Sequence, residues 1–425
     1  MSGGIPRKGE PIWPYQPPPP EPADENTINL ALFPYVPNPK AFEAVVQALW
    51  NETKSPIKLQ WANYNCYREE PPDTLDVYAF DCAYADDLMA NGKLDPIAAA
   101  EIAGLDDLMP FARANAAIDE HEQRFAGIPY LGCTSVIFYR KGDAALENLN
   151  PVTVAQLLAV MGKADYSTAK PPANKGLMID LSSKTVDALD YAAAFRYCRN
   201  QWWPTPMPMP LPPQIEAEAL QGLVGYREMA GVAQATYKDP GTDRVRWLEE
   251  GCGRALNGYP EAMGSMRPDA LPGLRLRPMP VSPAQQRDEL VCYADAVGLR
   301  PGMSEQKKAA ALELANLIAS AKVFVSSVVG ATCQYLTPTR ASVLQALAKD
   351  PAVGPKYTEI ASMLQGGSYK PVPFRLGNGV RPWAPAMGEA IISKLFPGIE
   401  EEVMERPSVA FGYETTPAGI RRKGD

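Results

Sequence analysis

Histidine is almost absent from this chain of 425 residues, which contains only His121. That residue lies in the polar run 119–124, which is typical of a solvated surface. A Ser–His–Asp triad or a Cys–His pair would depend on this one side chain, so we do not expect such a device. A nucleophile in this protein needs another base, and a carboxylate is the candidate.

Cysteine is also sparse: the seven thiols are scattered along the chain and include no Cys-x-x-Cys pair. Together with the single histidine, this spacing argues against a structural zinc site. We expect most of these thiols to be buried as small apolar side chains. If the protein is exported, one or two disulfides are an alternative that the sequence does not exclude.

Long hydrophobic runs and an excess of positive charge are missing as well. No stretch of about 18 uninterrupted apolar residues occurs, so we expect no membrane partner. The formal net charge is −8. Because nucleic-acid-binding proteins usually carry a basic face, we expect no nucleic-acid partner, and an acidic chain is compatible with a small cationic ligand.

Residues 1–26 lack the features of a secretory signal, namely a basic start, an apolar stretch and a small-residue cleavage site. Four consecutive prolines at 17–20 predict a flexible, proline-rich leader instead. The sequence does not decide between two compartments. The protein either stays inside the cell or is exported by a signal that this sequence does not carry.

What the chain does contain predicts an α/β protein of two lobes. Its length exceeds one ordinary core, and short apolar strands alternate with helical segments, which favours a largely parallel sheet. The predicted strands are 28–33, 57–61, 75–80, 136–139, 177–181, 255–261 and 290–297. The predicted helices are 40–51, 86–89, 95–105, 106–117, 187–199, 214–226, 245–250 and 307–320. The proline-rich segment 202–213, which includes two adjacent tryptophans, is expected to form a stiff loop.

Cys133 is the candidate nucleophile. It follows a loop marked by Pro129 and Gly132 and precedes the predicted strand 136–139, so it can face a crevice instead of a core. Glu261 has two readings. It is either an exposed loop acid or, in a dry cleft, a base with a raised pKa that can take the thiol proton.

Two aspartates lie where a lone charge would be costly. Asp295 interrupts the apolar strand 290–297, and Asp81 closes the strand 75–80. A buried carboxylate needs a partner, which could be an arginine or a ligand. Four tyrosines near strand ends would, with these acids, suit a flat cationic heteroaromatic ring, although each alone is more often a packing residue. They are Tyr35, Tyr67, Tyr259 and Tyr293.

In ordered blocks, the sequence resembles the type I thiaminases, or thiamine pyridinylases. The blocks are Leu32–Pro37, Tyr67–Asp81, Gly127–Cys133, Phe138–Asp143, Gly253–Ala255, Gly258–Glu261, Tyr293 with Asp295, and Phe374–Gly377. The resemblance implies a two-lobed type II periplasmic-binding-protein-like fold with an interlobe cleft. We expect a leader over 1–26, a first lobe of 27–132 with about 296–340, a second lobe of 133–295 with about 341–400, and a tail over 401–425.

The resemblance also implies a transferase that replaces the thiazole of thiamine, or of a related pyrimidine, with an organic base (an amine or pyridine) or a thiol. By position, Cys133 matches the nucleophile that adds to the pyrimidine, and Glu261 matches its base. Asp81, Asp295 and the four tyrosines match positions around the aminopyrimidine. This chemistry requires no metal or organic cofactor. The family is usually secreted or periplasmic, and we expect a monomer.

Two other functions stay open. A non-catalytic solute-binding protein for thiamine or a related pyrimidine would not need a cysteine–glutamate pair. A related enzyme could act on another heterocycle, because Pro260 stands where the family pattern leads us to expect a small polar residue.

Overall fold

The structure is a computed structural model that describes residues 25–149, 152–199, 208–239, 241–282, 289–329, 333–365, 367–398, 414–416 and 419–421. Most of the expected leader and tail, and the two adjacent tryptophans, lie outside these residues. The described part of the proline-rich segment, 208–213, contains no helix, and its one bridge joins Met209 to Leu376.

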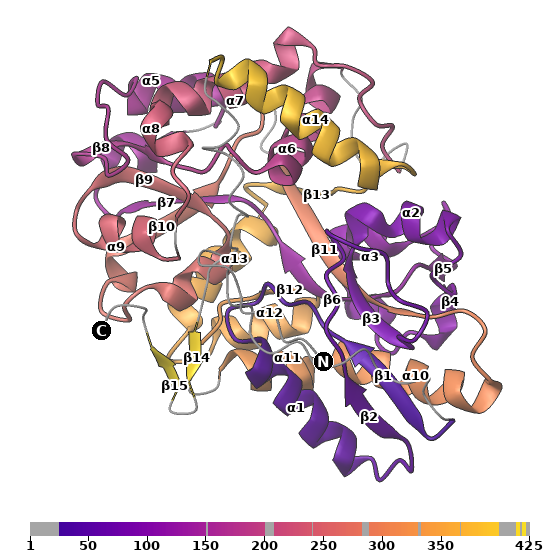
Figure 1. The fold of residues 1–425 in the computed structure, drawn as a ribbon. Helices are drawn as coiled ribbons and strands as arrows, with labels where there is room; N and C mark the ends of the chain where they lie inside the picture. The colour runs from indigo at the N-terminus through magenta and orange to yellow at the C-terminus, as the bar shows by residue number, and fades with distance from the viewer. Residues whose placement is uncertain are drawn as a thin grey trace, which may run out of the picture.

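Two β-sheets form the centres of two lobes (Figure 1). The seven-stranded sheet has the order β12-β6-β11-β3-β1-β2, with β13 also paired to β11, and the four-stranded sheet has the order β10-β7-β9-β8. The first sheet comprises β1 (Thr27–Ala31), β2 (Lys58–Trp61), β3 (Val77–Asp81), β6 (Ile128–Cys133), β11 (Glu289–Leu299), β12 (Thr337–Pro338) and β13 (Lys370–Pro373). The second comprises β7 (Val136–Arg140), β8 (Ala173–Met178), β9 (Gly253–Gly258) and β10 (Leu274–Pro278).

Helices cover both sheets. Those before β8 are α1 (Pro39–Glu52), α2 (Ala85–Ala90), α3 (Pro110–Ala116), α4 (Ala144–Glu147) and α5 (Val154–Met161). Those between β8 and β11 are α6 (Lys184–Cys198), α7 (Ala217–Ala230), α8 (Val232–Ala235) and α9 (Asp243–Glu249). The last are α10 (Glu305–Ile318), α11 (Ala321–Val328), α12 (Ala341–Ala348), α13 (Gly354–Leu364) and α14 (Val380–Leu395). Short 3₁₀ helices include η1 (Cys82–Tyr84) and η4 (Pro260–Ser265), and two small hairpins pair β4 (Ile97–Ala98) with β5 (Arg124–Phe125) and β14 (Glu414–Thr416) with β15 (Gly419–Arg421).

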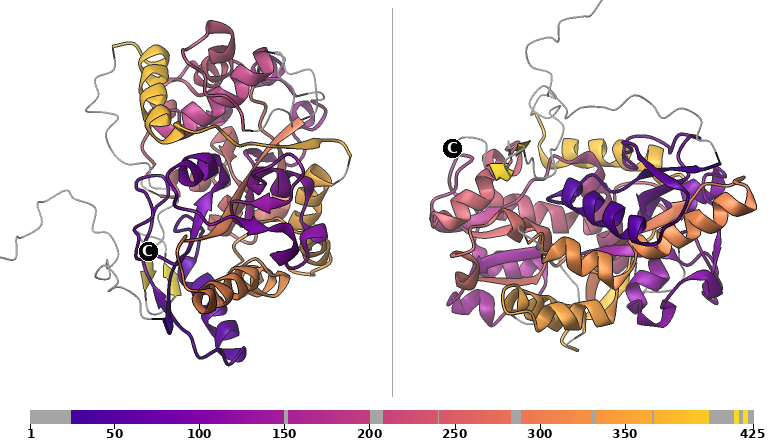
Figure 2. Two further views of the ribbon diagram at one scale, coloured as in Figure 1. Left: turned by 90° about the vertical axis from the view of Figure 1, so that its right-hand side faces the viewer. Right: turned by 90° about the horizontal axis from the view of Figure 1, so that it is seen from below.

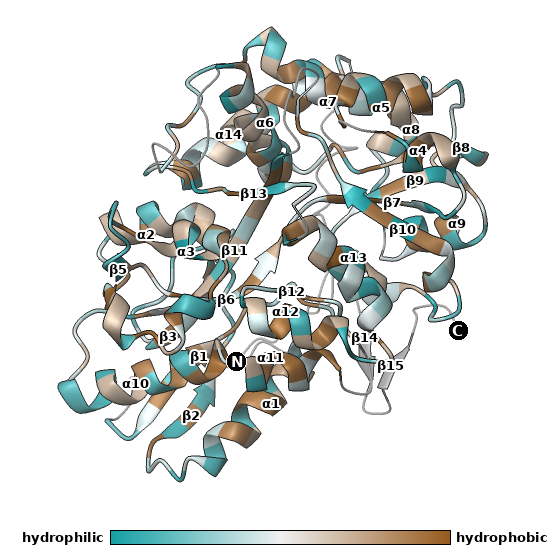
Figure 3. Cartoon of the chain, turned by 180° about the vertical axis from the view of Figure 1, so that it is seen from behind, coloured by the Kyte–Doolittle hydropathy of each residue, from teal (hydrophilic) through white to brown (hydrophobic). Residues whose placement is uncertain are grey.

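Hydrophobic and hydrophilic residues mix along the covering helices, as expected where one face is buried (Figure 3). The start of α1 follows the sequence signal, since Asn38 caps it by accepting from the amide of Ala41 at 3.0 Å and Pro39 is its first residue. The C-terminal helix α14, yellow in both views of Figure 2, packs on α6 and α7.

The larger sheet is mixed, so the prediction of a largely parallel sheet is wrong. Strands β1, β2 and β3 are parallel, but β11 enters antiparallel between β3 and β6. The chain enters β11 after β10 of the four-stranded sheet, and β11 then runs antiparallel to both β3 and β6. Large α/β sheets often combine parallel and antiparallel strands in this way.

The predicted helix 95–105 is also wrong. Pro96 and Gly104 weaken the alanine-rich run, and Ile97 pairs with Phe125 in a hairpin where both side chains are buried. Tertiary packing here outweighs the helix propensity of alanine. The predicted strand 255–261 ends earlier, at Gly258, and Glu261 lies in η4.

The seven cysteines are free thiols in the structure, which contains no disulfide among them. Three are buried and four are half-buried, so burial is less general than expected. Among the described residues, no single helix has the length and apolar character to cross a membrane; α10 and α11 meet those criteria only as a pair bent by 47°.

An ion cluster around Asp76, the residue before β3, provides a test of the fold. The carboxylate of Asp76, 1% exposed, accepts from Arg300 and from the buried Lys307, each at 2.9 Å, and from the amide of Asn29 at 2.9 Å. Replacing one member of a buried pair leaves the other charge unpaired.

We therefore expect Asp76→Asn to lower the free energy of unfolding by about 3–5 kcal/mol, measured by urea denaturation. The control is Asp73→Asn, which removes an exposed ion pair with Lys93 and should leave the transition unchanged. Equal stability of both variants would contradict a structural role for the Asp76 cluster.

Candidate active site

Cys133 lies where the chain passes from one sheet to the other. It is the last residue of β6, and only Thr134 and Ser135 separate it from β7. The segment before it is a strand, so the expected loop is wrong. Pro129 is accommodated because the register of β6 against β11 shifts at this point, between Asp295 and Ala296, and prolines are tolerated at such irregularities.

Close packing fixes the backbone beside the thiol. A Cβ atom at Gly132 would lie 3.2 Å from the ring of Phe111 and 3.2 Å from the methyl group of Thr337. The buried hydroxyl of Thr134 donates to the carbonyl of Val291 at 2.9 Å, which ties the crossing to β11. Cys133 itself is half-buried and stands opposite Tyr293 on β11.

Two carboxyl groups stand directly opposite each other on β3 and β11. Asp81 pairs with Asp295 in antiparallel register, which directs both side chains to the same face of the sheet. Asp81 accepts from the Tyr67 hydroxyl at 2.8 Å and from the Ala83 amide at 2.8 Å. Among the described residues, the side chain of Asp295 makes no hydrogen bond or ion pair, although the residue is only 7% exposed.

This difference decides which acid carries the proton. Burial, with the charges of Asp81 and Glu261, raises the pKa of Asp295 well above its usual range. Burial also raises the pKa of Asp81, but the donors Ala83 and Tyr67 oppose that shift. Asp295 is therefore the acid of the pair that holds its proton more strongly. Within the described chain, no arginine fills the partner role considered from the sequence.

Glu261 is half-buried in η4, which begins at Pro260, so the alternative of an exposed loop acid is wrong. Proline suits this first helical position. Burial raises the pKa of Glu261 to about 7. Its charge acts on both Cys133 and Asp295, so it belongs to the same cluster, and it is divided between its acid and base forms at neutral pH.

The cluster keeps the thiol protonated at rest. Burial raises the pKa of Cys133 well above its usual value, and the charges of Glu261, Asp295 and Asp81 raise it further. A thiol in these surroundings reacts only after a base takes its proton or a cation enters the site.

All four predicted tyrosines lie in or beside this cluster. The rings of Tyr35 and Tyr67 are 5.7 Å apart and both pack on Phe33, at 5.4 and 5.8 Å. Tyr35 accepts from the Asn65 amide at 2.5 Å. Burial raises the pKa of Tyr259, and the charges of Cys133, Asp190 and Glu261 raise it further.

Tyr293 packs on Phe374 at 4.9 Å between ring centres. Burial raises its pKa, and Asp190, Tyr259, Cys133 and Asp81 contribute in that order. The sequence candidates on β3, β6, η4 and β11 are thus brought together.

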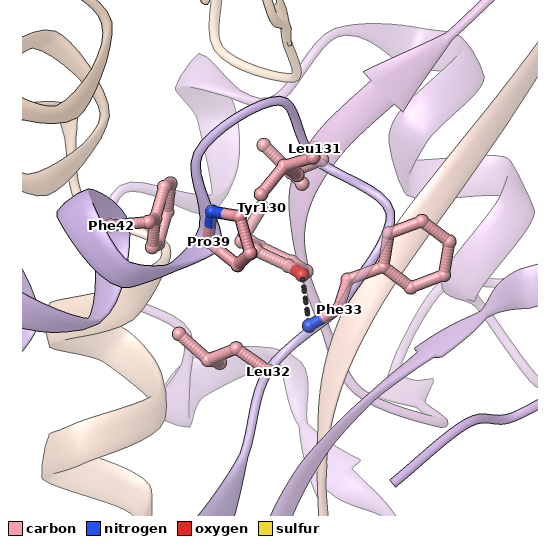
Figure 4. Close-up of a pocket in the computed structure, with 7 residues that line it drawn as sticks. Leu32, Phe33, Pro39, Phe42, Tyr130 and Leu131 are labelled. Atoms are coloured by element: carbon pink, nitrogen blue, oxygen red, sulfur yellow. Dashed lines mark hydrogen bonds between the residues drawn. The ribbon is translucent and has the colours of Figure 1, made fainter. Parts of the chain in front are cut away.

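A small apolar cavity adjoins the cluster beneath the loop that carries Tyr35 (Figure 4). It is lined by Leu32, Phe33, Val36, Pro39, Phe42, Tyr130 and Leu131. The Tyr130 hydroxyl accepts from the Phe33 amide at 3.3 Å. With this apolar lining, the cavity supports the loop and does not supply chemistry.

Sequence reasoning did not single out three residues near the candidate site: Asp190, Phe33 and Ser135. Of these, Ser135 hydrogen-bonds with Tyr259. A signal existed for Asp190 alone: Asp187 and Asp190 lie three residues apart, hence on one face, in a helix otherwise rich in alanine. Among the described residues, no three histidine, cysteine or acidic side chains are arranged to hold a metal ion.

Residues 134–282 match the family model described as Thiaminase-1 domain. The chain is 30% identical over 364 residues to Thiaminase-1 of Paenibacillus thiaminolyticus, which covers 84% of this chain and 85% of that protein. The structure of Clostridium botulinum thiaminase I in complex with thiamin is 30% identical, with a TM-score of 0.78 over 87% of this chain and 99% of that chain. Maltose-bound MalE3 of T. maritima, 13% identical, shares the fold with a TM-score of 0.59 over 89% of this chain and 97% of that chain.

The MalE3 likeness confirms the predicted two-lobed, type II periplasmic-binding-protein-like α/β fold. On the identity and coverage of its relatives, the chain belongs to the thiaminase-1 family, whose members are enzymes of the transferase type.

Proposed function

We propose that this enzyme cleaves thiamine and transfers its pyrimidinylmethyl group to an amine, pyridine or thiol, through a covalent adduct on Cys133. The observation that carries the proposal is the meeting of one thiol with Glu261 and the neutral acid Asp295 in a member of the thiaminase-1 family. The thiamin complex of the 30% identical relative supports thiamine as the substrate.

The two aspartates hold the aminopyrimidine in this proposal. Asp295, as the neutral acid, donates its proton to a ring nitrogen and then pairs with the protonated ring. Asp81, held by Tyr67 and Ala83, accepts from the amino group. Tyr35, Tyr67, Tyr259 and Tyr293 offer aromatic faces to the two rings of the substrate.

Glu261 takes the Cys133 proton, and the thiolate forms a bond to pyrimidine C6 while the ring nitrogen receives the displaced π electrons. The amino nitrogen then supplies electrons to form the C5=CH2 bond. The bond from that carbon to the thiazolium nitrogen breaks, and the thiazole leaves as a neutral molecule.

The second half restores the enzyme. The incoming nucleophile bonds to the methylene carbon, electrons return to the ring, and the sulfur–C6 bond breaks to release the thiolate. As the ring regains its aromaticity, the ring nitrogen returns its proton to Asp295. With an amine or a thiol, Glu261 loses its first proton to solvent, takes the proton of the nucleophile and returns it to Cys133, so one proton is released for each cationic thiamine consumed. Pyridine carries no such proton, so Glu261 returns its first proton to Cys133 and the product keeps the positive charge.

The two-lobed fold suits an active site between the lobes. We propose that residues 27–132 with about 296–340 form one lobe and 133–295 with about 341–400 the other, and that the enzyme acts as a monomer. Cys133 then lies at a crossing between lobes, where closure on the substrate can exclude water.

Incubation with thiamine and aniline should consume thiamine and yield its aniline derivative, followed by mass spectrometry. Cys133→Ala should lose this activity, because no other group can form the adduct. Cys252→Ala removes a half-buried thiol outside the cluster and should keep full activity. Binding of thiamine without consumption by the unaltered protein would favour a solute-binding function.

Glu261→Gln should lower kcat by about 10²- to 10⁴-fold, since the thiol loses its base. A base must be ionised, so the wild-type rate should fall as pH decreases through about 7, and the variant should lose this dependence. The exposed neighbour Asp269→Asn serves as the control. A wild-type pH profile in Glu261→Gln would exclude Glu261 as the base.

Asp295→Asn should lower kcat/KM by about 10²-fold or more, because an amide cannot protonate the ring. The same change should raise stability. A carboxyl with a raised folded pKa binds its proton more tightly when folded, so wild-type stability falls as pH rises above the usual aspartate pKa.

The melting temperature of Asp295→Asn should therefore exceed that of the wild type by a margin that grows from pH 4 to pH 8. A constant margin would show that Asp295 ionises without a folding cost, against the assignment of a neutral acid.

A further inference from the structure

The loop that carries Tyr67 lies between β2 and β3 and has no helix or strand of its own over residues 62–76. Asn65 begins a turn there. Its side chain accepts from the Tyr67 amide at 3.1 Å. Its carbonyl accepts from the amides of Arg68 and Glu69 at 3.0 and 3.1 Å. These bonds use the amides of the turn, so the carbonyl groups of the turn need donors from elsewhere in the chain.

Arg381, far along the chain, supplies such donors. It is the second residue of α14, and its Nη1 donates to the carbonyls of Cys66 at 2.7 Å and Glu69 at 3.0 Å. These two carbonyls lie on either side of Tyr67 in the chain. A guanidinium suits two acceptors because its donors are fixed in one plane. Within the described residues, Arg381 forms no ion pair with a carboxylate, so its donors serve the loop.

The same guanidinium also supports the ring of Tyr67, through Tyr84 of η1. Its central carbon lies 5.1 Å from the centre of the Tyr84 ring, a cation–π distance. The Tyr84 ring meets the Tyr67 ring edge to face, with 5.6 Å between ring centres. The Tyr67 hydroxyl then donates to Asp81 at 2.8 Å. Contacts through both the backbone and the ring of Tyr67 therefore join Arg381 to the Asp81 carboxylate.

Arg381 is itself held from two directions. Asp87 of α2, which is 3% exposed, accepts from the backbone amides of Gly379 and Arg381, the latter at 2.8 Å. Beyond this start, α14 packs along α6 and α7, which belong to the proposed second lobe (Figure 1). Tyr67 and Asp81 belong to the proposed first lobe. Arg381 therefore links a loop of one lobe to a helix of the other.

The orientation of Asp81 depends on one donor at each carboxylate oxygen. The Ala83 amide donates to Oδ1 and the Tyr67 hydroxyl donates to Oδ2. Without the hydroxyl, the carboxylate keeps a single fixed oxygen and can turn. A small misplacement of a group that must meet a substrate atom is enough to weaken binding and slow the reaction.

Building on the proposed function, we infer that Arg381 is a positioning residue that sets the Tyr67 hydroxyl on Asp81, so that this carboxylate meets the amino group of the pyrimidine. Arg381 acts through Tyr67 and does not touch the substrate in this role. Because α14 packs on the second lobe, the position of that lobe also bears on Asp81.

Titration calorimetry in a Cys133→Ala background tests this without turnover. The ligand is 4-amino-5-hydroxymethyl-2-methylpyrimidine, which carries the amino group that Asp81 accepts from. Arg381→Met removes the donors and should weaken binding about 10-fold or more. The stoichiometry of the titration reports the folded fraction. The matched control, Arg227→Met, removes a half-buried arginine that donates to the Leu395 carbonyl at the other end of α14 at 2.8 Å, and should keep the affinity within about twofold.

A double-mutant cycle separates positioning from a general loss of stability. In a Tyr67→Phe background, which lacks the hydroxyl on Asp81, Arg381→Met should change the affinity by about twofold or less. Equal weakening with and without the hydroxyl, or weakening in neither, would overturn the inference. In the active enzyme, Arg381→Met should raise KM for thiamine about 10-fold, whereas a loss of folded enzyme would lower kcat and leave KM unchanged.

The two proposals fail in different ways. If the unaltered enzyme does not consume thiamine, the proposed function is wrong whatever the titrations show. If it consumes thiamine and the effect of Arg381→Met is the same with and without the Tyr67 hydroxyl, only the role of Arg381 is wrong. Failure of Cys133→Ala to bind the fragment would count against both.

Discussion

The carboxyl groups of Asp81, Asp295 and Glu261 act on the thiol of Cys133 in a partly buried site, and within the described chain no hydrogen bond or ion pair of Asp295 offsets that burial. The charges of Asp81 and Glu261 disfavour ionisation of Asp295, and all three acids disfavour ionisation of the sulfur. Burial and these charges therefore favour the protonated, uncharged forms of Cys133 and Asp295 at rest. A cationic substrate reverses this balance, because it favours the carboxylates and the thiolate at once. In the proposed reaction, the positive charge that the site selects in its substrate therefore also favours ionisation of the Cys133 thiol.

The backbone holds this arrangement by joining elements that are distant in sequence. Cys133 and Tyr293 are opposite residues on β6 and β11, and Asp81 and Asp295 are opposite residues on β3 and β11. One strand, β11, therefore positions groups from both of its neighbours. The hydrogen bond from Thr134 to Val291 ties the crossing between sheets to that strand. Residues outside the proposed catalytic set thus fix the positions of those within it.

Sequence reasoning recovered the parts of the fold that depend on local signals. The Asn38–Pro39 helix start and the strands before Asp81 and after Cys133 follow from capping, apolar patterning and turn residues. The direction of β11 did not follow, because strand pairing between lobes leaves no local pattern. The helix expected over 95–105 failed because Ile97 is paired with Phe125 in a hairpin.

The candidate site was predictable to a similar degree. Cys133, Glu261 and the acid pair were found from their sequence contexts, and the structure brings them together. Which acid is neutral could not be predicted, since it depends on the donors Tyr67 and Ala83 reaching Asp81 and not Asp295.

The central claim is that Glu261 converts a neutral, buried Cys133 into the attacking thiolate. Intact-mass spectrometry after mixing with a pyrimidine that bears a leaving group at C6 tests it most directly. The account predicts a single adduct, located on Cys133 by peptide mapping, whose rate of formation rises as pH increases through about 7. An adduct on another cysteine, or a rate independent of pH in this range, would contradict it.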